Sequence, residues 1–504
     1  MTLLIVGLAL LVAWPFYNLT LVVYTARDGK NSGRHSRPGG NPPTGHEPAA
    51  FWIVVPCLNE ERVVGQTVRY ALELHGPLNT RTRVLVVNDG SDDGTPLVLA
   101  GIDDPNLHVL NRVLPDARNG KGEALNAAVR YIRKVTAAEG TDPAAVAVGV
   151  IDGDGRASRN MLTEVSWALR DAAVGATQSR VRIHNRNKLL AAMQDMEFAC
   201  IANASQLMRN ALGTVGLGGN GQFARLSALD MLGDAPWSAC LVEDLEVGLR
   251  MHLAGVKIRY ISRAAVTQQG LTDVRRLLRQ RTRWAQGNLQ CIRYVPRLFN
   301  ARRIPNSALV EMMYYLLAPW ANAFGTLAVA VLAAFSVGRI AVLGRAAAPP
   351  GSWLQLTATV GVWGLAMLTP FLMWGVLHRV QLRDEKLSRC LLAGLCYPGF
   401  LFLGLISTYR AIGRQVTGRN SWAKTERLAD DWEADQMTES DDELSQTIET
   451  GLQPAGTTTV AVQTMKAGAK APEPPVVEAD LFDEEPPPVS QHRLAQVTQL
   501  LSRA

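Results

Sequence analysis

Cysteine is scarce and scattered in this chain. Among its 504 residues are six cysteines, and no two of them form a Cys-x-x-Cys pair. They are Cys57, Cys200, Cys240, Cys291, Cys390 and Cys396. This pattern excludes a disulfide framework and a zinc site built from cysteine pairs, and it is typical of a reducing compartment.

Two further absences exclude a class of enzyme and a type of N-terminal segment. No Gly-x-Gly-x-x-Gly follows the first predicted strand, which excludes a dinucleotide-binding oxidoreductase. No Lys or Arg precedes the first apolar run, residues 3–24, and basic residues begin only at Arg27. A signal peptide would carry its charge on the other side and end in a cleavage site. We therefore predict a retained transmembrane helix over residues 1–26, a Gly- and Pro-rich linker over 27–49, and a cytoplasmic location for the domain after the linker.

Long apolar runs return after residue 305. Those at 308–337, 352–377 and 389–408 are each long enough to span a bilayer, which predicts about three transmembrane helices within 306–412. The net charge of +6 is concentrated near apolar segments and favours a lipid surface, not nucleic acid, as the partner. Three spans would leave the carboxyl end outside, whereas the basic residues after the last run favour the inside. The sequence leaves this conflict open.

The last segment, residues 413–504, is basic at first and then acidic and Pro-rich. Such a composition cannot bury enough apolar surface to fold alone, so we predict a disordered tail. It could dock an unknown partner or remain a solvated tail.

Residues 50–270 alternate predicted strands and helices. Four apolar stretches, at 51–55, 83–87, 108–110 and 145–151, are predicted strands with helices between them. This alternation predicts an α/β domain with a parallel sheet. The polar clusters fall directly after the strands, at the edge where ligands of such sheets bind.

An acidic pair, Asp152 and Asp154, follows the strand at 145–151. Two carboxylates at a strand end suit Mg²⁺ or Mn²⁺, which bind one or two carboxylates together with substrate phosphates. The alternative is an ordinary Asp-Gly turn, because Asp-x-Asp is a weak motif alone. Gly153 and Gly155 would also leave the pair loosely held.

Two later segments carry charge in a suggestive pattern. Glu243 and Asp244 open a predicted helix, where the helix dipole alone would favour an acidic pair. Residues 271–305 mix arginines with apolar side chains, which predicts amphipathic helices lying in the membrane interface. Within them lies the sequence Gln280-Arg281-Thr282-Arg283-Trp284, whose residues could equally be lipid-facing.

Together, five ordered motifs resemble the membrane-embedded family-2 glycosyltransferases, whose processive branch includes cellulose, chitin, hyaluronan and poly-N-acetylglucosamine synthases. The motifs are Pro56…Asn59-Glu60, Asp89-Gly90-Ser91, Asp152…Asp154, Glu243-Asp244 and Gln280…Arg283-Trp284. The resemblance implies a GT-A-like nucleotide-sugar-binding domain on the cytoplasmic face of a multi-pass protein of the plasma or inner membrane.

The resemblance also implies roles at the donor end. Glu60 and Asp89 would contact the base and ribose of a UDP-sugar, with Pro56, Asn59 and Ser91 in the same motifs. Lys121 would lie near the phosphates, Asp152 would face the diphosphate, and Asp154 would hold the metal. Because Asn88 stands where the family often has Asp, Asp92 is a possible substitute for Asp89.

At the acceptor end, Asp244 would be the general base, with Glu243 beside it and Val242 where the family has Thr. Arg283 would stabilise the leaving diphosphate, and Trp284 would offer a flat face to the acceptor sugar. Gln280, Gly219 and Phe223 would line the same channel.

The implied reaction is inverting transfer of a hexose or N-acetylhexosamine to the non-reducing end of a growing β-linked polysaccharide, coupled to its export. Two alternatives remain: transfer of one sugar to a lipid carrier, and a scaffold that binds nucleotide sugar without chemistry. The sequence does not identify the sugar or the linkage.

Overall fold

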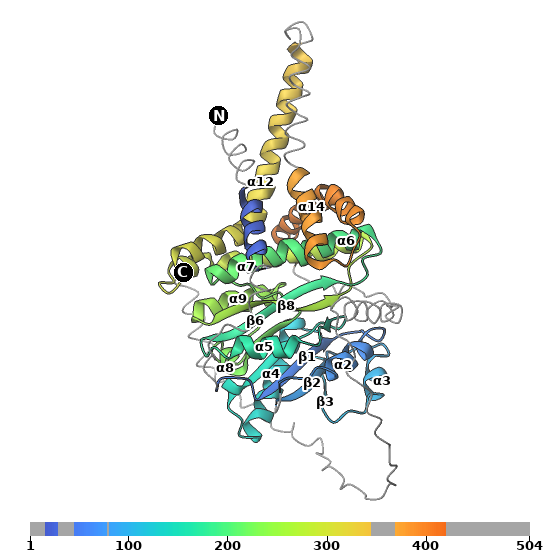
Figure 1. The fold of residues 1–504 in the computed structure, drawn as a ribbon, viewed down its shortest axis with the longest axis vertical. Coiled ribbons are helices and arrows are strands. Elements are labelled where there is room, and N and C mark those ends of the chain that lie inside the picture. Colours follow the sequence, from blue (N-terminus) through green and yellow to red (C-terminus); the bar gives the residue numbers. More distant parts are fainter. Residues whose placement is uncertain (1–15, 29–44, 78–79, 344–367, 420–504) are drawn as a thin grey trace, which may run out of the picture. The chain divides into compact units, whose positions relative to one another are not determined.

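The structure is a computed structural model that describes residues 16–28, 45–77, 80–343 and 368–419 (Figure 1). The first part of the predicted helix at 1–26, most of the linker, part of the run at 352–377 and the tail beyond 419 lie outside the described residues. The described residues comprise an α/β domain and the helices packed on it.

One eight-stranded sheet forms the centre of the domain, in the order β3-β2-β1-β4-β7-β6-β8-β5. The four predicted strands are all present, as β1, β2, β3 and β4. Strands β1, β2 and β4 contain the apolar runs typical of strands buried on both faces, whereas β3, at the edge of the sheet, has no buried residue. The strands are β1 (Ala50–Cys57), β2 (Arg81–Asn88), β3 (Leu107–Asn111), β4 (Val146–Val150), β5 (Arg156–Ala157), β6 (Val174–Ile183), β7 (Gln222–Arg225) and β8 (Lys257–Gln268).

The sheet is mixed, so the prediction of a parallel sheet is wrong for its second half. Strands β3, β2, β1 and β4 are parallel, but β7 runs antiparallel to both β4 and β6, and β5 runs antiparallel to β8. The chain reverses into β7 through a turn in which Gly219 and Gly221 both have positive φ. The chain between β6 and β7 first passes through the helical residues 189–212, so β7 pairs with β4 and β6 across long connections and not through a hairpin.

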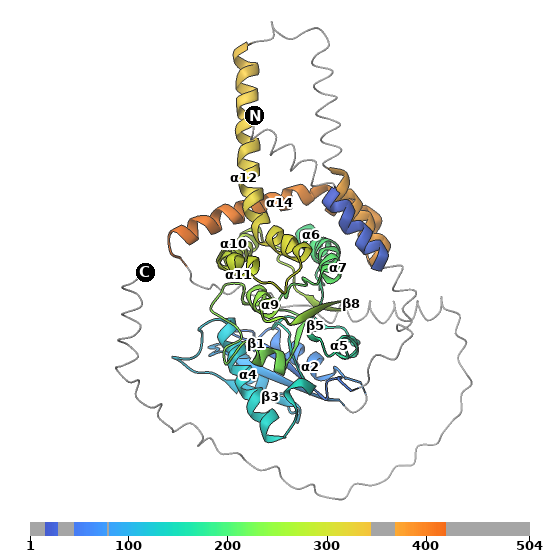
Figure 2. The same ribbon diagram turned by 90° about the vertical axis from the view of Figure 1, so that its left-hand side faces the viewer.

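Helices cover both faces of the sheet (Figures 1 and 2). Helices α4, α8 and α9 pack on the face that receives Trp52 and Val54, while α2, α3 and α5 pack on the face that receives Phe51, Ile53 and Val55. These helices are α2 (Val64–Leu72), α3 (Thr95–Ala100), α4 (Lys121–Ala138), α5 (Met161–Leu169), α8 (Leu226–Asp230) and α9 (Glu243–Ala254). The alternation of β1 side chains thus builds two cores from one strand.

A second group of helices packs beside the sheet. It includes α6 (Leu189–Asp195), the π-helix η2 (Met196–Ala202), α7 (Asn203–Leu212), α10 (Val274–Cys291), α11 (Val295–Phe299), α12 (Asn306–Leu343) and α14 (Leu387–Val416). Helical residues 16–28 and 368–382 join α6, η2, α7 and α14 in one apolar cluster. In Figure 2 residues 16–28, drawn in blue, lie beside residues 368–382, and the Trp374 Nε1 donates a hydrogen bond of 2.8 Å to Asn18 Oδ1.

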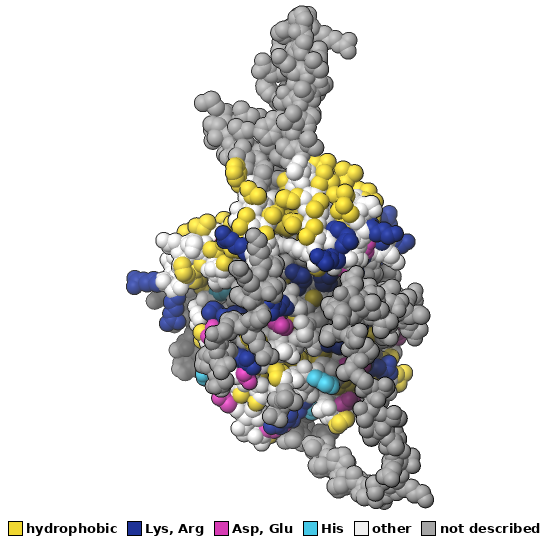
Figure 3. All heavy atoms as spheres, viewed as in Figure 1, with side chains coloured by type: hydrophobic (Ala, Val, Ile, Leu, Met, Phe, Trp, Pro, Cys, Tyr) yellow, Lys and Arg dark blue, Asp and Glu magenta, His cyan; other side chains and the backbone are white. Residues whose placement is uncertain are grey.

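Among the described residues, α14 is the one helix long and apolar enough to cross a membrane, with a mean hydropathy of 1.9 over its most apolar window. The run at 308–337 lies within the continuous helix α12, which passes through Pro319. A transmembrane region of several helices therefore stays a prediction. Figure 3 shows apolar side chains gathered over α14 with Lys and Arg side chains bordering them. Exposed apolar residues of α14 include Leu392, Leu395, Leu401 and Phe402.

The close approach of β4 and β7 yields a first prediction. A Cβ added at Gly149 would lie 2.2 Å from Phe223 Cε1, and the Phe223 ring is fully buried and cannot move aside. We expect Gly149→Ala to lower the free energy of unfolding by about 1–3 kcal/mol, as overpacking does in cores. Thermal unfolding of the detergent-solubilised protein measures this.

Gly101→Ala is the matched control, because its added Cβ would have its nearest neighbour at an ordinary 3.5 Å and its φ is negative. An equal change in melting temperature for both variants would contradict the packing account.

Candidate active site

A cavity of about 190 Å³ lies at the carboxyl ends of β1, β2 and β4. The amino ends of α4 and α9 reach it from one side, and α10 and η2 reach it from the other. Most of the predicted site residues line it. They are Pro56, Glu60, Asp89, Lys121, Asp152, Glu243, Asp244, Gln280, Arg283 and Trp284. The sheet thus brings together side chains separated by more than two hundred positions in sequence.

Asp89 follows β2 and is held from two sides. Its backbone N–H donates to Cys57 O at 2.8 Å, and its carboxylate pairs with Arg112 Nη1 at 2.5 Å. The residue is 5% exposed, and burial raises the pKa of Asp89 although Arg112 opposes the shift. Arg112 thereby offsets part of the cost of a buried carboxylate at the cavity wall.

Asn59 and Ser91 shape the loops beside the cavity and do not line it. Asn59 has a φ of +54°, and its side chain exchanges hydrogen bonds with the Asp92 carboxylate at 2.6 Å and the Asp92 N–H at 3.0 Å. Its own N–H donates to Ser91 Oγ at 2.9 Å. Asp92 also pairs with Arg118 on the surface and does not line the cavity, whereas Asp89 does. These contacts hold the two loops that carry Glu60 and Asp89.

Lys121, the first residue of α4, lies among carboxylates. Its Nζ is 2.5 Å from Asp152 Oδ1 and 3.8 Å from Glu243 Oε1. Burial by itself would lower the pKa of Lys121, but Asp152, Glu243 and Asp244 outweigh it, and the pKa is raised above its ordinary value. The ammonium therefore remains charged across the physiological range and holds the two acidic motifs together.

Glu243 and Asp244 occupy the first turn of α9, and both line the cavity. Burial raises the pKa of Glu243 to about 7 and also raises the pKa of Asp244, with Lys121 opposing both shifts. Glu243 is the more buried of the two, whereas Asp244 is only partly buried and its Oδ1 accepts from Leu245 N at 2.7 Å. A helix-end charge pair on the surface would not be desolvated in this way, so these acids belong to the cavity.

The turn before β7 forms part of the wall. Gly218 lines the cavity, and Gly219, at φ +76°, lies beside Asp244 and Lys121. Asn220 links the turn to the sheet, because its Oδ1 accepts from Asp152 N at 3.2 Å and its Nδ2 donates to Gln268 Oε1 at 2.9 Å.

Phe223 does not reach the acceptor side, contrary to the sequence-based expectation. Its ring is fully buried against Phe51, with ring centroids 6.3 Å apart, in the space that Gly149 leaves open. Strand pleating accounts for this, since successive side chains of β7 point to opposite faces.

Asp154 lies behind the cavity wall. It is fully buried, it does not line the cavity, and its Oδ2 accepts from Gln269 N at 3.1 Å. The flanking glycines pack tightly and do not loosen the motif: a Cβ at Gly155 would lie 2.6 Å from Ile151 Cγ2.

A divalent cation fits at Asp152. Its side chain is 25% exposed on the cavity wall, and Mg²⁺ takes one or two carboxylates plus phosphate and water ligands. Within the described ranges no three His, Cys, Asp or Glu side chains gather to hold a metal ion. The residues fit a cation that takes most of its ligands from a diphosphate, and Asp154 as a metal ligand stays a prediction.

Helix α10 closes the other side of the cavity. Gln280, Arg283 and Trp284 line it, so the alternative that these residues face lipid is wrong. Arg283 Nη1 donates to Leu241 O at 3.0 Å, just before α9. A Cβ at Gly287 would meet the Val242 side chain and N–H within 2.8 Å. Val242, placed where the family has Thr, is thus a packing residue that fixes α9 against α10.

Residues 48–287 match the family model for Glycosyltransferase like family 2. These residues form a family-2 glycosyltransferase domain. The matched range contains all five predicted motifs and every residue that lines the cavity.

Curated relatives of this glycosyltransferase domain include a glycolipid synthase and a polysaccharide synthase. Beta-monoglucosyldiacylglycerol synthase of Trichormus variabilis is 33% identical over 242 residues, covering 47% of this chain and 48% of that protein. Poly-beta-1,6-N-acetyl-D-glucosamine synthase of Staphylococcus epidermidis is 28% identical over 246 residues, covering 47% of this chain and 53% of that protein. The chain spans about half the length of the curated relatives it matches.

A solved structure shares the fold. The mannosyltransferase PcManGT of Pyrobaculum calidifontis, in complex with GDP-Man and Mn²⁺, superposes with a TM-score of 0.51 at 19% identity. The match covers 83% of this chain and 99% of that one. The GT-A-like fold of the glycosyltransferase domain is therefore established.

Several residues of the site were not predicted. Arg112 follows β3, and a basic residue after a strand end is a signal that sequence reading could have used. Val181, Phe198 and Gln268 also line the cavity. They come from β6, η2 and β8, none of which was recognised.

A substitution at Gly219 tests whether the close approach of this turn to Asp244 and Lys121 matters for activity. A Cβ there would lie 3.0 Å from Asp244 Oδ2 and 3.3 Å from Lys121 Nζ. We expect Gly219→Ala to reduce sugar transfer on the order of ten- to a hundredfold, as small displacements of catalytic groups do. Initial rates with a nucleotide sugar, measured on membranes with equal amounts of protein, give the result.

Gly213→Ala is the matched control, because Gly213 has the same φ of +76° with nothing within 4 Å of its added Cβ. Both variants carry the backbone strain, and only Gly219→Ala crowds Asp244. Equal losses of transfer in the two variants would show that strain alone is responsible.

Proposed function

We propose that this chain is an inverting glycosyltransferase that moves one sugar from a nucleotide-diphosphate sugar to a hydroxyl group of a membrane-held acceptor. The observation that carries this proposal is the convergence of Asp244, Lys121, Asp152 and Arg283 on one cavity. A carboxylate base and a set of charges suited to a diphosphate then lie on the same cavity. We further propose that the domain works at the cytoplasmic face of the cell membrane, with α14 and the predicted spans as its anchor.

In this proposal Asp244 is the general base. The acceptor oxygen attacks the anomeric carbon while its proton passes to the Asp244 carboxylate. The bond from the anomeric carbon to the phosphate oxygen breaks, and its electron pair leaves with the nucleoside diphosphate. One displacement from the face opposite the leaving group inverts the configuration, so an α-linked donor gives a β-linked product. Positioned general bases contribute typically 10²- to 10⁴-fold to such steps.

Cations on the cavity wall support departure of the diphosphate. Lys121 is held in its charged form by the surrounding carboxylates, and Arg283 presents a planar fork that matches phosphate oxygens. A Mg²⁺ or Mn²⁺ ion bound at Asp152 would neutralise further charge on the diphosphate. Glu60 and Asp89, which line the same cavity, are the proposed contacts of the base and ribose.

Two acceptors are considered for this reaction. The Gln280…Arg283-Trp284 motif favours the end of a growing β-linked polysaccharide, which would make the enzyme processive. A glycerolipid is the second candidate, and the observation that favours it is the higher identity to the glucosyldiacylglycerol synthases, 33% against 28%. Both place the acceptor hydroxyl beside Asp244 and Trp284.

A donor and acceptor panel tests the function. Purified membranes are incubated with labelled UDP-glucose, UDP-N-acetylglucosamine and GDP-mannose, with Mg²⁺, Mn²⁺ or chelator, and with dioleoylglycerol, cellotetraose or chitotetraose. We expect transfer from one UDP-sugar with a cation present. Long products indicate the processive enzyme, and a single labelled lipid indicates the glycolipid enzyme. UDP binding without transfer from any donor would reject the enzyme and favour a scaffold.

Removal of the base tests the mechanism. We expect Asp244→Asn to reduce transfer by about 10²- to 10⁴-fold, because the amide cannot accept the acceptor proton. UDP affinity, measured by isothermal titration, should stay nearly unchanged because the proposed nucleotide contacts, Glu60 and Asp89, are other side chains. Normal turnover by this variant would rule out Asp244 as the base.

The pH dependence follows from the acid pair. The base acts only when deprotonated, and the pKa of Glu243 is raised to about 7 while that of Asp244 is also raised. Because Asp244 is the proposed base, we expect the transfer rate to rise with pH along an acid limb that lies above the usual pKa range of an aspartate, and then to level off. Because Lys121 lowers both pKa values, Lys121→Met should move the acid limb of the pH–rate profile to higher pH.

Lys134→Met, an exposed position on the same helix, is the control and should leave the limb in place. A Lys121→Met profile with an unmoved limb would show that Lys121 does not act on the acid pair.

A further inference from the structure

The π-helix η2 carries an aromatic side chain into the catalytic cavity. Phe198 lines this cavity and is only partly buried, whereas Met196, Ala199 and Cys200 of the same helix are buried in the apolar cluster. A π-helix fits more residues into each turn than an α-helix and is frequently found at functional sites. Phe198 therefore faces away from the core that holds its neighbours.

Phe198 and Trp284 form a corner at the acceptor end of the cavity. Their ring centroids are 6.3 Å apart and their planes meet at 79°, an edge-to-face arrangement. Both rings keep part of their surface open to the cavity that Asp244 and Arg283 also line. Aromatic faces supply rigid apolar contact area, which suits the apolar faces of a sugar ring.

An ion pair fixes the corner from behind. Arg281 binds the Glu197 carboxylate with both terminal nitrogens, Nη1 to Oε1 at 2.7 Å and Nη2 to Oε2. The Arg281 Cζ lies 4.7 Å from the Trp284 ring centroid, 5.8 Å from that of Phe198 and 5.4 Å from that of Phe400 on α14. One guanidinium thus contacts both rings of the corner and the long apolar helix.

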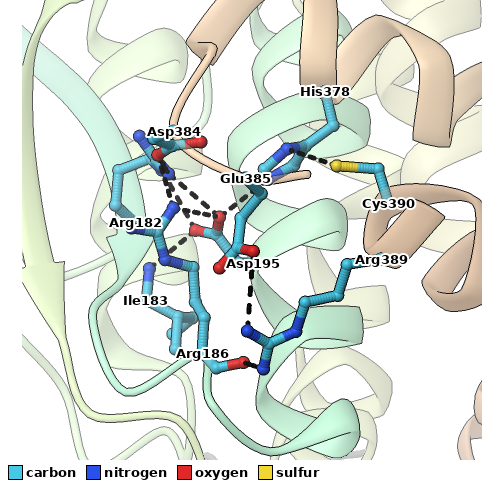
Figure 4. Close-up of polar contacts among 9 residues, drawn as sticks. All are labelled: Arg182, Ile183, Arg186, Asp195, His378, Asp384, Glu385, Arg389 and Cys390. Atoms are coloured by element: carbon cyan, nitrogen blue, oxygen red, sulfur yellow. Dashed lines mark hydrogen bonds and ion pairs between the residues drawn. The ribbon is translucent and has the colours of Figure 1, made fainter. Parts of the chain in front are cut away.

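A second cluster fixes the start of η2 (Figure 4). Asp195, the residue before η2, is fully buried and accepts two hydrogen bonds of 3.0 Å from Arg182 and one of 2.8 Å from Ile183 N. His378 Nε2 lies 2.9 Å from Asp195 Oδ2. Arg182 also binds Asp384 at 2.6 Å and follows Val181, another cavity residue. The start of η2, the helix that carries Phe198, is therefore bonded both to β6 and to residues 378–384.

The charge of Asp195 is compensated within this cluster. Burial alone would raise the pKa of Asp195, but Arg182, His378 and Arg186 outweigh it and lower the pKa below its ordinary value. A compensated carboxylate of this kind is costly to displace, because each broken contact leaves a buried charge without its partner.

We propose that Phe198 is a specificity-determining residue of this enzyme and forms, with Trp284, the subsite that holds the terminal sugar ring of the acceptor. This inference rests on the proposed transferase function. It requires that the acceptor already carries a sugar. The rigid attachment of η2 supports the subsite, because a ring that must orient an acceptor hydroxyl toward Asp244 has to be held in place.

Two matched leucine variants test the proposal. Phe198→Leu removes a ring that lines the cavity, and Phe400→Leu removes a ring that contacts the same Arg281 but does not line the cavity. Initial rates are measured in membranes with the UDP-sugar that the wild type uses, varying cellotetraose, chitotetraose and dioleoylglycerol in turn. We expect Phe198→Leu to raise the KM for a tetrasaccharide roughly five- to tenfold, with the donor KM unchanged.

Phe198→Tyr should restore the tetrasaccharide KM, because it retains the ring, and Phe400→Leu should leave it unchanged. An unchanged tetrasaccharide KM in Phe198→Leu, or a wild type that uses dioleoylglycerol alone, would overturn this proposal and leave the transferase function standing. A wild type that transfers from no donor would instead reject the proposed function itself. A fall in rate for both leucine variants with constant KM values would assign the rings a purely structural role.

Discussion

The Lys121 ammonium is the charge on which the site depends. It sits at the start of α4, bonded to Asp152 after β4 and close to Glu243 at the start of α9. Three elements that are distant in sequence are therefore joined by one buried cation. Without it, three carboxylates would share a desolvated cavity, and each would be forced towards its neutral form. With it, Asp152 has a cationic partner, and the pKa of Asp244 stays lower than burial alone would set it. The same cation therefore offsets the charge of the buried carboxylates and lowers the pKa of the proposed base.

Backbone geometry sets how closely these charges approach. Gly219 leaves space beside Asp244 and Lys121 that any side chain would fill, and Gly287 lets α10 approach Val242 at the start of α9. Arg283 and Trp284 lie one turn before Gly287, so this close contact also sets their distance from the acid pair.

Sequence reading located what is encoded locally. The strands β1, β2 and β4 are short apolar runs followed by polar clusters, and that pattern is sufficient to place Asp89, Asp152 and the sheet edge. It could not place side chains whose direction depends on partners elsewhere. Phe223 turned into the core because Gly149, on another strand, leaves a space for it. The position of Phe198 in the cavity could not be predicted, because it depends on a π-helix. A search for a period of 3.6 residues does not reveal a π-helix. Strands β6 and β8 carry charged residues that mask their alternation.

The side of the cavity lined by Phe198 and Trp284 is connected to the apolar helix α14 by side-chain contacts. Arg281 contacts Trp284, Phe198 and Phe400, and Gln286, two residues after Trp284, accepts from Arg414 Nε at 2.9 Å near the end of α14. Displacement of α14 would therefore disturb α10 and η2 together, because both are held through the same side chains. The donor side is instead built on β1, β2 and β4, whose cores are formed with α2, α4 and their neighbours. Under the proposed function, the acceptor would meet the part of the cavity that is fixed to the apolar helix α14, and the nucleotide sugar would meet the part fixed to the sheet.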